Sequence, residues 1–385
     1  MRKKTFGRTG LDLSILGFGC MRLPLTNPAD LTSIDYDLSA AMLRRAIDQG
    51  VNYVDTAWPY HGVNRVDPGQ SEVFVARALK EGYREKVSLA TKLPTWLVKN
   101  KADMHRFLDA QLKRLEVGQI DFYLAHNLNS IVWPGILANG LAEFFDEALG
   151  DGRIKYAGFS FHDRPDVFED ILKSYDWTFA QIQYNYLDTD YQAGRTGLKM
   201  AADKGLGLII MEPLRGGFLI RQLTEEMKSL MAGARPEWSA ADWAFRWLWS
   251  QPEIGVVLSG MSAMDQVEEN LRIAAAAEPL TEPENEVLAR IREVFLERLK
   301  VNCTGCGYCL PCPEGVHIPK NFSYFNDYWL TDSPDFRARA KMYFNAQVPK
   351  HESFANCVHC RQCEEKCPQS LAISELMDEV AAVFN

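Results

Sequence analysis

Eight of the nine cysteines lie in two short runs near the end of the chain. The runs are Cys303-Thr-Gly-Cys306-Gly-Tyr-Cys309-Leu-Pro-Cys312-Pro313 and Cys357-Val-His-Cys360-Arg-Gln-Cys363-Glu-Glu-Lys-Cys367-Pro368. Closely spaced thiols in a run that ends in Cys-Pro are typical of proteins that hold two 4Fe–4S clusters. Three cysteines wrap around one cluster, and the fourth, which the proline turns away, reaches the other. The pattern therefore predicts one-electron chemistry in this part of the chain.

The crossed pattern predicts two sets of cluster ligands. One set is Cys303, Cys306, Cys309 and Cys367, and the other is Cys357, Cys360, Cys363 and Cys312. The first run has two residues, not three, before its last cysteine, which departs from the usual spacing. Disulfides are rare in a reducing compartment, and zinc usually takes two separated C-x₂-C pairs. Both alternatives therefore fit the runs less well than clusters do.

Polar side chains also end several short apolar stretches in the first 275 residues. Asp55 lies in the stretch 51–56, Lys92 follows 87–91, and His126 ends 120–126. Each stretch predicts a strand, and a longer stretch with helical spacing follows each of them. Because the carboxyl ends of parallel strands meet at one edge or one barrel mouth, we expect these three side chains to lie close together.

The alternation of strands and helices predicts the fold class. Eight strands between residues 13 and 259 fit an α/β fold, a (β/α)₈ TIM barrel of ~250 residues, with an open doubly wound sheet as the alternative. We place the barrel at residues 1–280 and a helical linker at 281–302. Residues 303–385 should form a small, mainly helical, ferredoxin-like iron–sulfur domain.

Ordered motifs across residues 1–275 resemble those of the aldo/keto reductase family. They are Phe6-Gly7-Arg8-Thr9-Gly10, Asp55-Thr56-Ala57 with Tyr60 and Ser71-Glu72, Gly158-Phe159-Ser160, Gln181-Ile182-Gln183, Pro213-Leu214-Arg215-Gly216-Gly217, and Ser259-Gly260 with Glu269-Asn270. The resemblance implies an oxidoreductase that reduces an aldehyde or ketone, or oxidises the alcohol, with a nicotinamide cofactor.

The resemblance gives catalytic roles to Asp55, Tyr60, Lys92 and His126. A carbonyl that accepts a hydride develops negative charge on its oxygen, so the site needs a proton donor and an electrostatic trap. A free tyrosine, with a pKa of about 10, is a weak acid at neutral pH. We expect the Lys92 ammonium to lower the pKa of Tyr60. Asp55 would hold Lys92, and His126 would hydrogen-bond the carbonyl oxygen.

The resemblance also implies two groups of cofactor-binding residues. The nicotinamide end would lie along Ser160, Gln183, Met211, Leu214 and Gly216, and the adenosine end along Ser259, Gly260, Gln266, Glu269 and Asn270. Residues 259–270 contain no Lys or Arg for a 2′-phosphate, so we expect NAD rather than NADP. Phe161 and Met211 replace the family's usual Asn and Tyr, and Gly216-Gly217 could instead cradle the phosphate of a flavin.

The composition limits the partners. The 385 residues are 47% apolar and carry a net charge of −9, as in an ordinary acidic globular protein. Nucleic acid needs a basic face, and a membrane span needs ~20 apolar residues, so we expect neither partner. The basic N-terminus is not followed by the apolar core of a signal peptide, which predicts a cytoplasmic protein.

Together the two parts predict an aldo/keto reductase-type oxidoreductase coupled to two 4Fe–4S clusters, with a small carbonyl or alcohol substrate. Clusters move one electron, whereas a nicotinamide gives two as a hydride, so the link between the parts stays open. The clusters could be structural, or they could pass electrons from a ferredoxin or another carrier to a flavin in the barrel. A non-catalytic, redox-sensing accessory subunit is a third alternative, which the catalytic quartet disfavours.

Overall fold

The computed structural model describes residues 1–330 and 334–385. Its contacts divide the chain into two compact units. The first unit consists of Met1–Tyr184, Asp188–Pro213 and Phe245–Pro279. The second consists of Asn185–Leu187, Leu214–Ala244 and Leu280–Asn385. The second unit therefore includes short segments that precede the linker in sequence as well as the cysteine-rich part.

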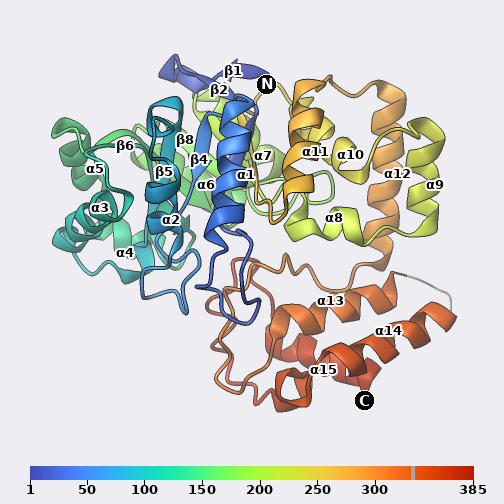
Figure 1. Ribbon diagram of the computed structural model, residues 1–385. Coiled ribbons are helices and arrows are strands. Elements are labelled where there is room, and N and C mark those ends of the chain that lie inside the picture. Colours follow the sequence, from blue (N-terminus) through green and yellow to red (C-terminus); the bar gives the residue numbers. More distant parts are fainter. Residues whose placement is uncertain (331–333) are drawn as a thin grey trace. The chain divides into compact units, whose positions relative to one another are not determined.

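Eight parallel strands of the first unit close into a barrel, in the order β10-β3-β4-β5-β6-β7-β8-β9 (Figure 1). They are β3 (Leu16–Gly19), β4 (Tyr53–Asp55), β5 (Ser88–Leu93), β6 (Ile120–Leu128), β7 (Ile154–Phe161), β8 (Phe179–Gln183), β9 (Gly207–Met211) and β10 (Val256–Ser259). The predicted (β/α)₈ barrel is confirmed.

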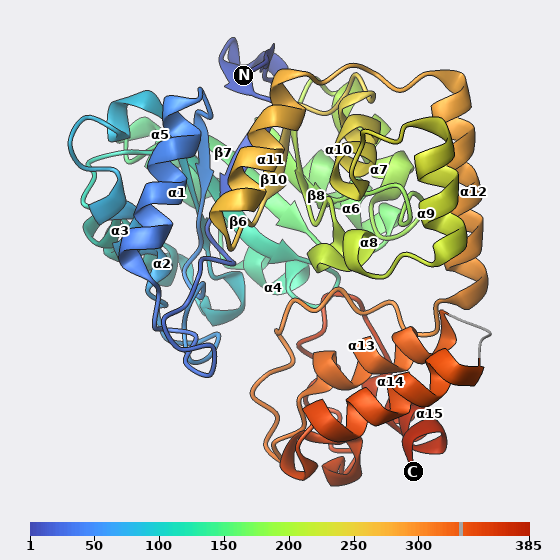
Figure 2. The same ribbon diagram turned by 45° about the vertical axis from the view of Figure 1, so that its right-hand side comes forward.

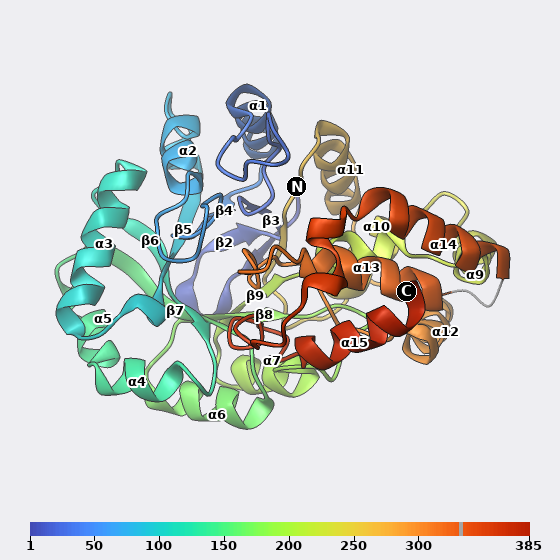
Figure 3. The same ribbon diagram turned by 90° about the horizontal axis from the view of Figure 1, so that it is seen from below.

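Helices follow the strands and surround them, as the view in Figure 3 shows. They are α1 (Tyr36–Asp48), α2 (Ser71–Ala78), α3 (Lys101–Leu115), α4 (Trp133–Ala138), α5 (Leu141–Gly150), α6 (Pro165–Ser174), α7 (Gly194–Asp203), α10 (Ala240–Trp249) and α11 (Met264–Ala275). In α1, Asp35 caps the first turn and accepts from the Leu38 N–H, while Leu43 and Ile47 are buried one turn apart.

A hairpin of β1 (Lys3–Thr5) and β2 (Asp12–Ser14) precedes the barrel and sends Phe6 into its core. The ring of Phe6 packs edge-on against Phe122 with centroids 5.7 Å apart. A side chain on Gly207 or Gly255 would collide with this ring, so both positions must stay small. The first of the eight expected strands, which begins near residue 13, is interrupted at Ile15, because β2 pairs in the hairpin and β3 in the barrel.

The second unit contains α8 (Phe218–Arg221), α9 (Glu225–Ala234) and the long helix α12 (Glu282–Arg298). Thr281 and Glu284 form a capping box at the start of α12. Glu284 also accepts from Arg235, at the end of α9, at 2.6 Å. This contact is one of those that join α9 to α12 within the second unit.

Three further helices form the core of the cysteine-rich part, α13 (Ile318–Trp329), α14 (Pro334–Gln347) and α15 (Ile373–Phe384), which run together in Figure 2. Phe322, Phe344 and Met377 are buried between them. The Asn326 amide exchanges two hydrogen bonds with the backbone of Val301, at 2.8 and 2.9 Å, and so ties α13 to the chain that leaves α12. The expected small helical domain is confirmed.

Among residues 1–330 and 334–385, no helix combines the length and the apolar character needed to cross a bilayer.

We expect Phe6→Ala to lower the free energy of unfolding of the barrel by about 3–5 kcal/mol, because it leaves a cavity that Gly207 and Gly255 cannot fill. Urea unfolding followed by near-UV circular dichroism measures this change. Lys3→Ala, an exposed position of the same hairpin, is the control and should stay within about 0.5 kcal/mol of the native protein. Equal effects of the two variants would contradict the role assigned to the Phe6 ring.

Candidate active site and cluster sites

The barrel brings the four expected catalytic residues together. Asp55 ends β4, Lys92 lies in β5, and His126 lies in β6, while Tyr60 belongs to the loop after β4. All four side chains are buried. Pairing of β4 with β5 sets Asp55 opposite Ala90, so that Lys92 projects from the adjacent strand near the same mouth.

Lys92 is the centre of this cluster. Its Nζ atom lies 2.6 Å from Asp55 Oδ1, 2.8 Å from the Thr56 carbonyl oxygen and 3.3 Å from Tyr60 Oη. The three hydrogens of the ammonium therefore each have an acceptor. This geometry holds the Tyr60 hydroxyl beside a fixed cation, an arrangement that can trap negative charge on a nearby oxygen.

The expected direction of the Tyr60 pKa is wrong for this structure. Burial raises the pKa of the Tyr60 phenol well above its ordinary value, and the charges of Asp55, Cys20 and Glu212 raise it further. Arg22 opposes this rise only in part. The expected decrease of the pKa considered the charge of Lys92 alone. The loss of water around the buried phenol raises the pKa and is the larger effect. Tyr60 is therefore a protonated phenol at neutral pH.

His126 completes the site as a neutral imidazole. Burial lowers the pKa of His126 well below its ordinary value, and the nearby charges of Lys92 and Arg65 lower it further. Its ring packs edge-on against Tyr60, with centroids 6.1 Å apart. The Thr95 hydroxyl donates to the His126 carbonyl oxygen at 2.6 Å and holds the strand end in place.

A buried polar network behind Lys92 supports β5. Glu72 Oε1 accepts from the Thr91 hydroxyl at 2.8 Å and from the Gln111 amide at 2.6 Å. Gln111 also donates to the Lys92 carbonyl oxygen at 3.1 Å, and Arg114 donates to Glu72 Oε2 at 2.9 Å. These bonds give Glu72 of the Ser71-Glu72 motif a structural task, which is to fix the strand that carries the lysine.

The expected nicotinamide residues are only partly brought together. Ser160 is opposite Gln181, not Gln183, in the pairing of β7 with β8. Gln183 instead donates to Asp188 at 3.1 Å. Gln181 was not among the expected site residues, although its place two residues earlier on the same strand puts it on the same face as Gln183.

Asn127 is a second residue that contacts Ser160 but was not among the expected site residues. It follows His126 directly, has a left-handed φ of 61° and donates its backbone N–H to Ser160 Oγ at 2.8 Å. Phe161, which stands where the family has Asn, packs instead against Phe168. The Oδ1 atom of Asn127, like Asp55 Oδ2 and Gln181 Oε1, is buried without a hydrogen-bond partner in the described part of the chain. Such oxygens are suited to a polar ligand that supplies N–H or O–H donors.

The residues expected at the adenosine end lie between the end of β10 and helix α11. Asn270 donates to Ser259 Oγ at 3.0 Å, and Gln266 Oε1 accepts from the Ser262 N–H at 2.9 Å. Glu269 is half-buried on α11. The first turn of a helix favours anionic groups, so the segment fits a phosphate-bearing cofactor.

Arg22 changes the argument about charge at this segment. Arg22 lies in the loop after β3 and packs against the loop that carries Gly260. A Cβ atom added to Gly260 would lie 3.4–3.5 Å from the aliphatic stem of Arg22. The count of basic residues over 259–270 alone missed it, because the contact joins distant parts of the sequence.

The remaining expected cofactor residues, Met211, Leu214 and Gly216, belong to different units. Met211 ends β9 in the barrel and is half-exposed. Leu214 and Gly216 lie in the second unit, at the short turn η4 (Arg215–Gly217), where Arg215, Gly216 and Gly217 all have left-handed φ angles of 49–88°. The Leu214 carbonyl oxygen accepts from the Gly217 N–H at 2.9 Å and closes this turn.

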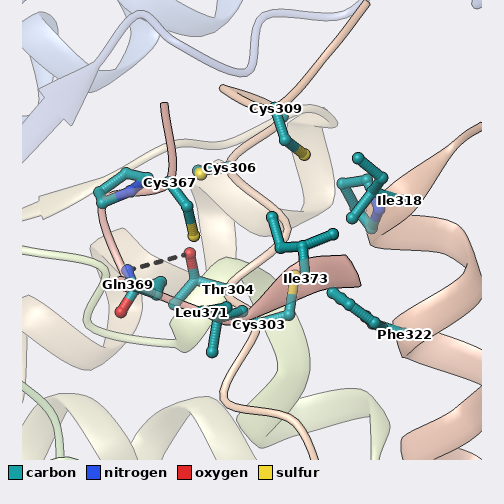
Figure 4. Close-up of a pocket in the computed structure, with 13 residues that line it drawn as sticks. Cys303, Thr304, Cys306, Cys309, Ile318, Phe322, Cys367, Gln369, Leu371 and Ile373 are labelled. Carbon is teal, nitrogen blue, oxygen red and sulfur yellow. Dashed lines mark hydrogen bonds between the residues drawn. The ribbon is translucent and has the colours of Figure 1, made fainter. Parts of the chain in front are cut away.

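The first set of cysteines surrounds a cavity of ≈ 300 Å³ (Figure 4). Cys303, Cys306, Cys309 and Cys367 line it, so the last cysteine of the second run joins the first three of the first run. Gln369 reaches Thr304 at 3.5 Å beside the cavity and links the two runs. The Gly305 N–H donates to Cys303 Sγ at 3.4 Å, a bond of the kind that tunes cluster potentials.

The second set surrounds a neighbouring cavity of ≈ 310 Å³, lined by Cys312, Cys357, Cys360 and Cys363. The two cavities share Ile318 and Ile373 in their linings. In the described ranges, 1–330 and 334–385, no three Cys, His, Asp or Glu side chains converge closely enough to hold a single ion. The four thiols of each set line one common space, which is the arrangement that a four-cysteine cluster site needs.

Burial opposes ionisation of thiols in both sets. Burial raises the pKa of Cys363 to about 11, and the neighbouring thiols of Cys312 and Cys357 contribute to the rise. Burial likewise raises the pKa of Cys309. Crowded thiolates repel one another and are stabilised by a shared cation, which iron provides.

Both cysteine runs use the same backbone turns. Gly305 and Gly307 of the first run have φ angles of 67° and 78°, and His359 and Arg361, at the matching places of the second run, have 56° and 59°. Left-handed conformation costs little for glycine and more for other residues. The repeat of the turns explains how two runs of different composition can surround cavities of similar size.

Comparisons with known proteins agree with this geometry. The model for "Aldo/keto reductase family" matches residues 15–293, and the model for "4Fe-4S dicluster domain" matches residues 302–372. A relative from Bacillus subtilis, the uncharacterized oxidoreductase YqkF, is 27% identical over 320 residues, which cover 75% of this chain and 95% of the relative.

Solved structures share the barrel. The holo form of aldo-keto reductase AKR11C1 from Bacillus halodurans has a TM-score of 0.62 and 26% identity, over 76% of this chain and 96% of that chain. An aldo/keto reductase from Klebsiella pneumoniae, solved with NADP and acetate, has a TM-score of 0.60 at 22% identity, over 76% and 95%. This chain belongs to the aldo/keto reductase family, as an oxidoreductase barrel followed by a 4Fe–4S domain.

Proposed function

We propose that the barrel reduces an aldehyde or ketone with a hydride from a nicotinamide cofactor, and that Tyr60 donates the proton. The observation that carries this proposal is the buried contact of Lys92 with both Asp55 and the Tyr60 hydroxyl, at 2.6 and 3.3 Å. Family membership supports the nicotinamide. The bound cofactor would supply the hydride, and the residues of the chain would control charge and protons.

The protonation states support this division of labour. Tyr60 keeps its proton until the carbonyl oxygen becomes basic enough to take it, because burial raises the pKa of the phenol. Once the proton leaves, Lys92 stabilises the phenolate beside it, and Asp55 holds Lys92 in place. His126, as a neutral imidazole, hydrogen-bonds the same carbonyl oxygen and orients it toward Tyr60.

For the cofactor, we propose Ser160, Gln181 and Asn127 at the nicotinamide end and the segment from Ser259 to Asn270 at the adenosine end. The unpartnered buried oxygens of Gln181 and Asn127 support a ligand with amide N–H donors. Neither NAD preference nor a flavin gains support from the comparisons, and Arg22 beside Gly260 weakens the charge argument for NAD.

We further propose that each cysteine set holds one 4Fe–4S cluster and that the clusters exchange single electrons with a ferredoxin or a similar small carrier. Solvent exposure of the cysteines favours the second set as the place where the carrier gives or takes electrons. Cys360 is exposed and the adjoining Val358 is 60% exposed, whereas Cys309 of the first set is only 7% exposed. Electron transfer between proteins needs a cluster near the surface, and the second set meets this need.

Tyr60→Phe should lower the kcat of carbonyl reduction by about 10²–10⁴-fold, because it removes the proton donor and keeps the ring. Tyr53→Phe is the matched control, since its buried hydroxyl has no hydrogen-bond partner in the described residues and lies in the barrel core. Steady-state rates with a panel of aldehydes measure the effect, and iron content should not change. Undiminished turnover by Tyr60→Phe would exclude the phenol as donor.

The rate of reduction should be flat between about pH 6 and pH 8. The pKa of His126 is lowered, so the imidazole stays neutral above pH 6, and the pKa of Tyr60 is raised, so the phenol stays protonated up to pH 8. Activity should fall only at higher pH, where Tyr60 ionises. The kcat measured across this range tests the expectation, and an inflection near the ordinary histidine pKa of about 6.5 would contradict it.

Cys312→Ala and Cys357→Ala should each remove about four of the eight iron atoms expected for two clusters. The two residues come from different runs but line one cavity, so the double variant should lose no more iron than either single variant. Iron analysis of anaerobically purified protein measures this, with Cys20→Ala in the barrel as the control. Additive iron loss in the double variant would refute the crossed ligand sets.

A further inference from the structure

Helix α15 begins at the wall of the second cysteine cavity. Three residues near its start, Ile373, Ser374 and Met377, line that cavity, and each is 1–2% exposed. Ile373 and Met377 are apolar, so Ser374 is the one of the three that brings a hydrogen-bonding side chain to this wall. A buried hydroxyl therefore lines the same space as the four thiols of the second set.

The backbone of Ser374 is fixed beside the second cysteine run. Its N–H donates to Glu364 Oε1 at 2.8 Å, and Glu364 directly follows Cys363 in the chain. The Glu364 N–H in turn donates to the Arg361 carbonyl oxygen at 3.0 Å. These bonds join the start of α15 to the run that carries three of the four cysteines of the second set. The hydroxyl-bearing residue thus keeps a set position relative to those cysteines.

The hydroxyl of Ser374 has no acceptor within residues 1–330 and 334–385. Its Oγ atom is buried there without a hydrogen-bond partner. A serine in a helix often bonds its hydroxyl to a backbone carbonyl oxygen of the preceding turn, and Ser374 makes no such bond. Because an unpaired buried hydroxyl costs free energy, its presence in the lining of a cavity indicates a ligand that accepts a hydrogen bond.

The rest of the lining shows which acceptor the second cavity offers. Glu314 and Arg361 also line it, but both residues are exposed to solvent. The other described side chains of the lining, apart from Ser374 and the four cysteines, are apolar, namely Val316, Ile318, Val358, Ile373 and Met377. Among the described side chains of this lining, the acceptors that remain in its interior are therefore sulfur atoms.

We infer that the Ser374 hydroxyl donates a hydrogen bond to a sulfur atom of the cluster held by the second set and so raises the reduction potential of that cluster. The inference rests on the proposed cluster at this set. A cluster that has taken up one electron carries one more negative charge, so a donated hydrogen bond stabilises the reduced form more than the oxidised form. Ser374 thus adjusts a potential and is not itself a ligand of iron.

A redox titration of Ser374→Ala tests the inference. Full-length protein is purified without oxygen, its iron is measured, and it is reduced in steps with dithionite while visible absorption and electron paramagnetic resonance are recorded. At a fixed ambient potential, Ser374→Ala should lower the ratio of reduced to oxidised second cluster about 10-fold, which equals a fall of ~59 mV for a one-electron couple. The potential of the first cluster should stay in place.

Three further variants make the titration specific. Cys306→Ala should lose the first cluster, so the step that persists in it belongs to the second cluster and is the one that Ser374→Ala should move. Ser374→Thr keeps a hydroxyl and should change the ratio by less than about 2-fold. Ser39→Ala is the matched control, because Ser39 Oγ in α1 is likewise buried without a partner in the described ranges. It should leave both potentials unchanged.

Iron content distinguishes failure of the inference from failure of the proposed function. About eight iron atoms in Ser374→Ala, with an unchanged or raised potential of the second cluster, would overturn the role of Ser374 and keep the clusters. Native protein that lacks the iron of two clusters would reject the proposed cluster sites and the inference with them. Loss of about four iron atoms in Ser374→Ala would also overturn the inference, because the hydroxyl would then retain the cluster and not adjust its potential.

Discussion

The mouth of the barrel depends on one buried ion pair, Asp55 with Lys92. Taking two charges out of water costs several kcal/mol per ion, so such a pair persists only where close contact and further hydrogen bonds offset that cost. Lys92 Nζ meets this condition with Asp55 Oδ1 at 2.6 Å and the Thr56 carbonyl oxygen at 2.8 Å. Pairing of β4 with β5 sets the distance, and a one-residue slip would turn Lys92 out of the barrel because alternate side chains face opposite sides. The proposed chemistry of Tyr60 thus relies on strand register.

Patterns that are local in sequence were predictable, and contacts between distant segments were not. The eight strands and the two cysteine runs follow from spacing over a few residues, and these predictions of the fold hold. The pKa of Tyr60 depends on how much water the closed barrel excludes, which no local pattern reports. Only the strand pairing shows that Gln181, and not Gln183, lies opposite Ser160. Arg22 contacts Gly260 although more than two hundred residues separate them in sequence. Those features needed the three-dimensional structure.

The cysteine-rich part is built as a repeat with unequal surroundings. The two runs share left-handed turns at matching places, and Ile318 and Ile373 line both cavities and separate them with apolar side chains. The first set includes the buried Cys309, whereas the second includes the exposed Cys360. Cluster potentials depend on solvent exposure and on hydrogen bonds to sulfur. Two clusters with the same ligands would therefore have different potentials here, which gives electrons a preferred direction between them.

The proposed pair of one-electron centres also bears on how this part relates to hydride chemistry. A hydride carries two electrons, and a single cluster accepts or gives one. Two such clusters together would hold two electrons, which is the number that one hydride carries. Because the second set includes the exposed Cys360 and the first includes the buried Cys309, a carrier at the surface would exchange electrons first with the second set. A redox role of the iron would therefore account for a pair of clusters, whereas a purely structural role does not require two.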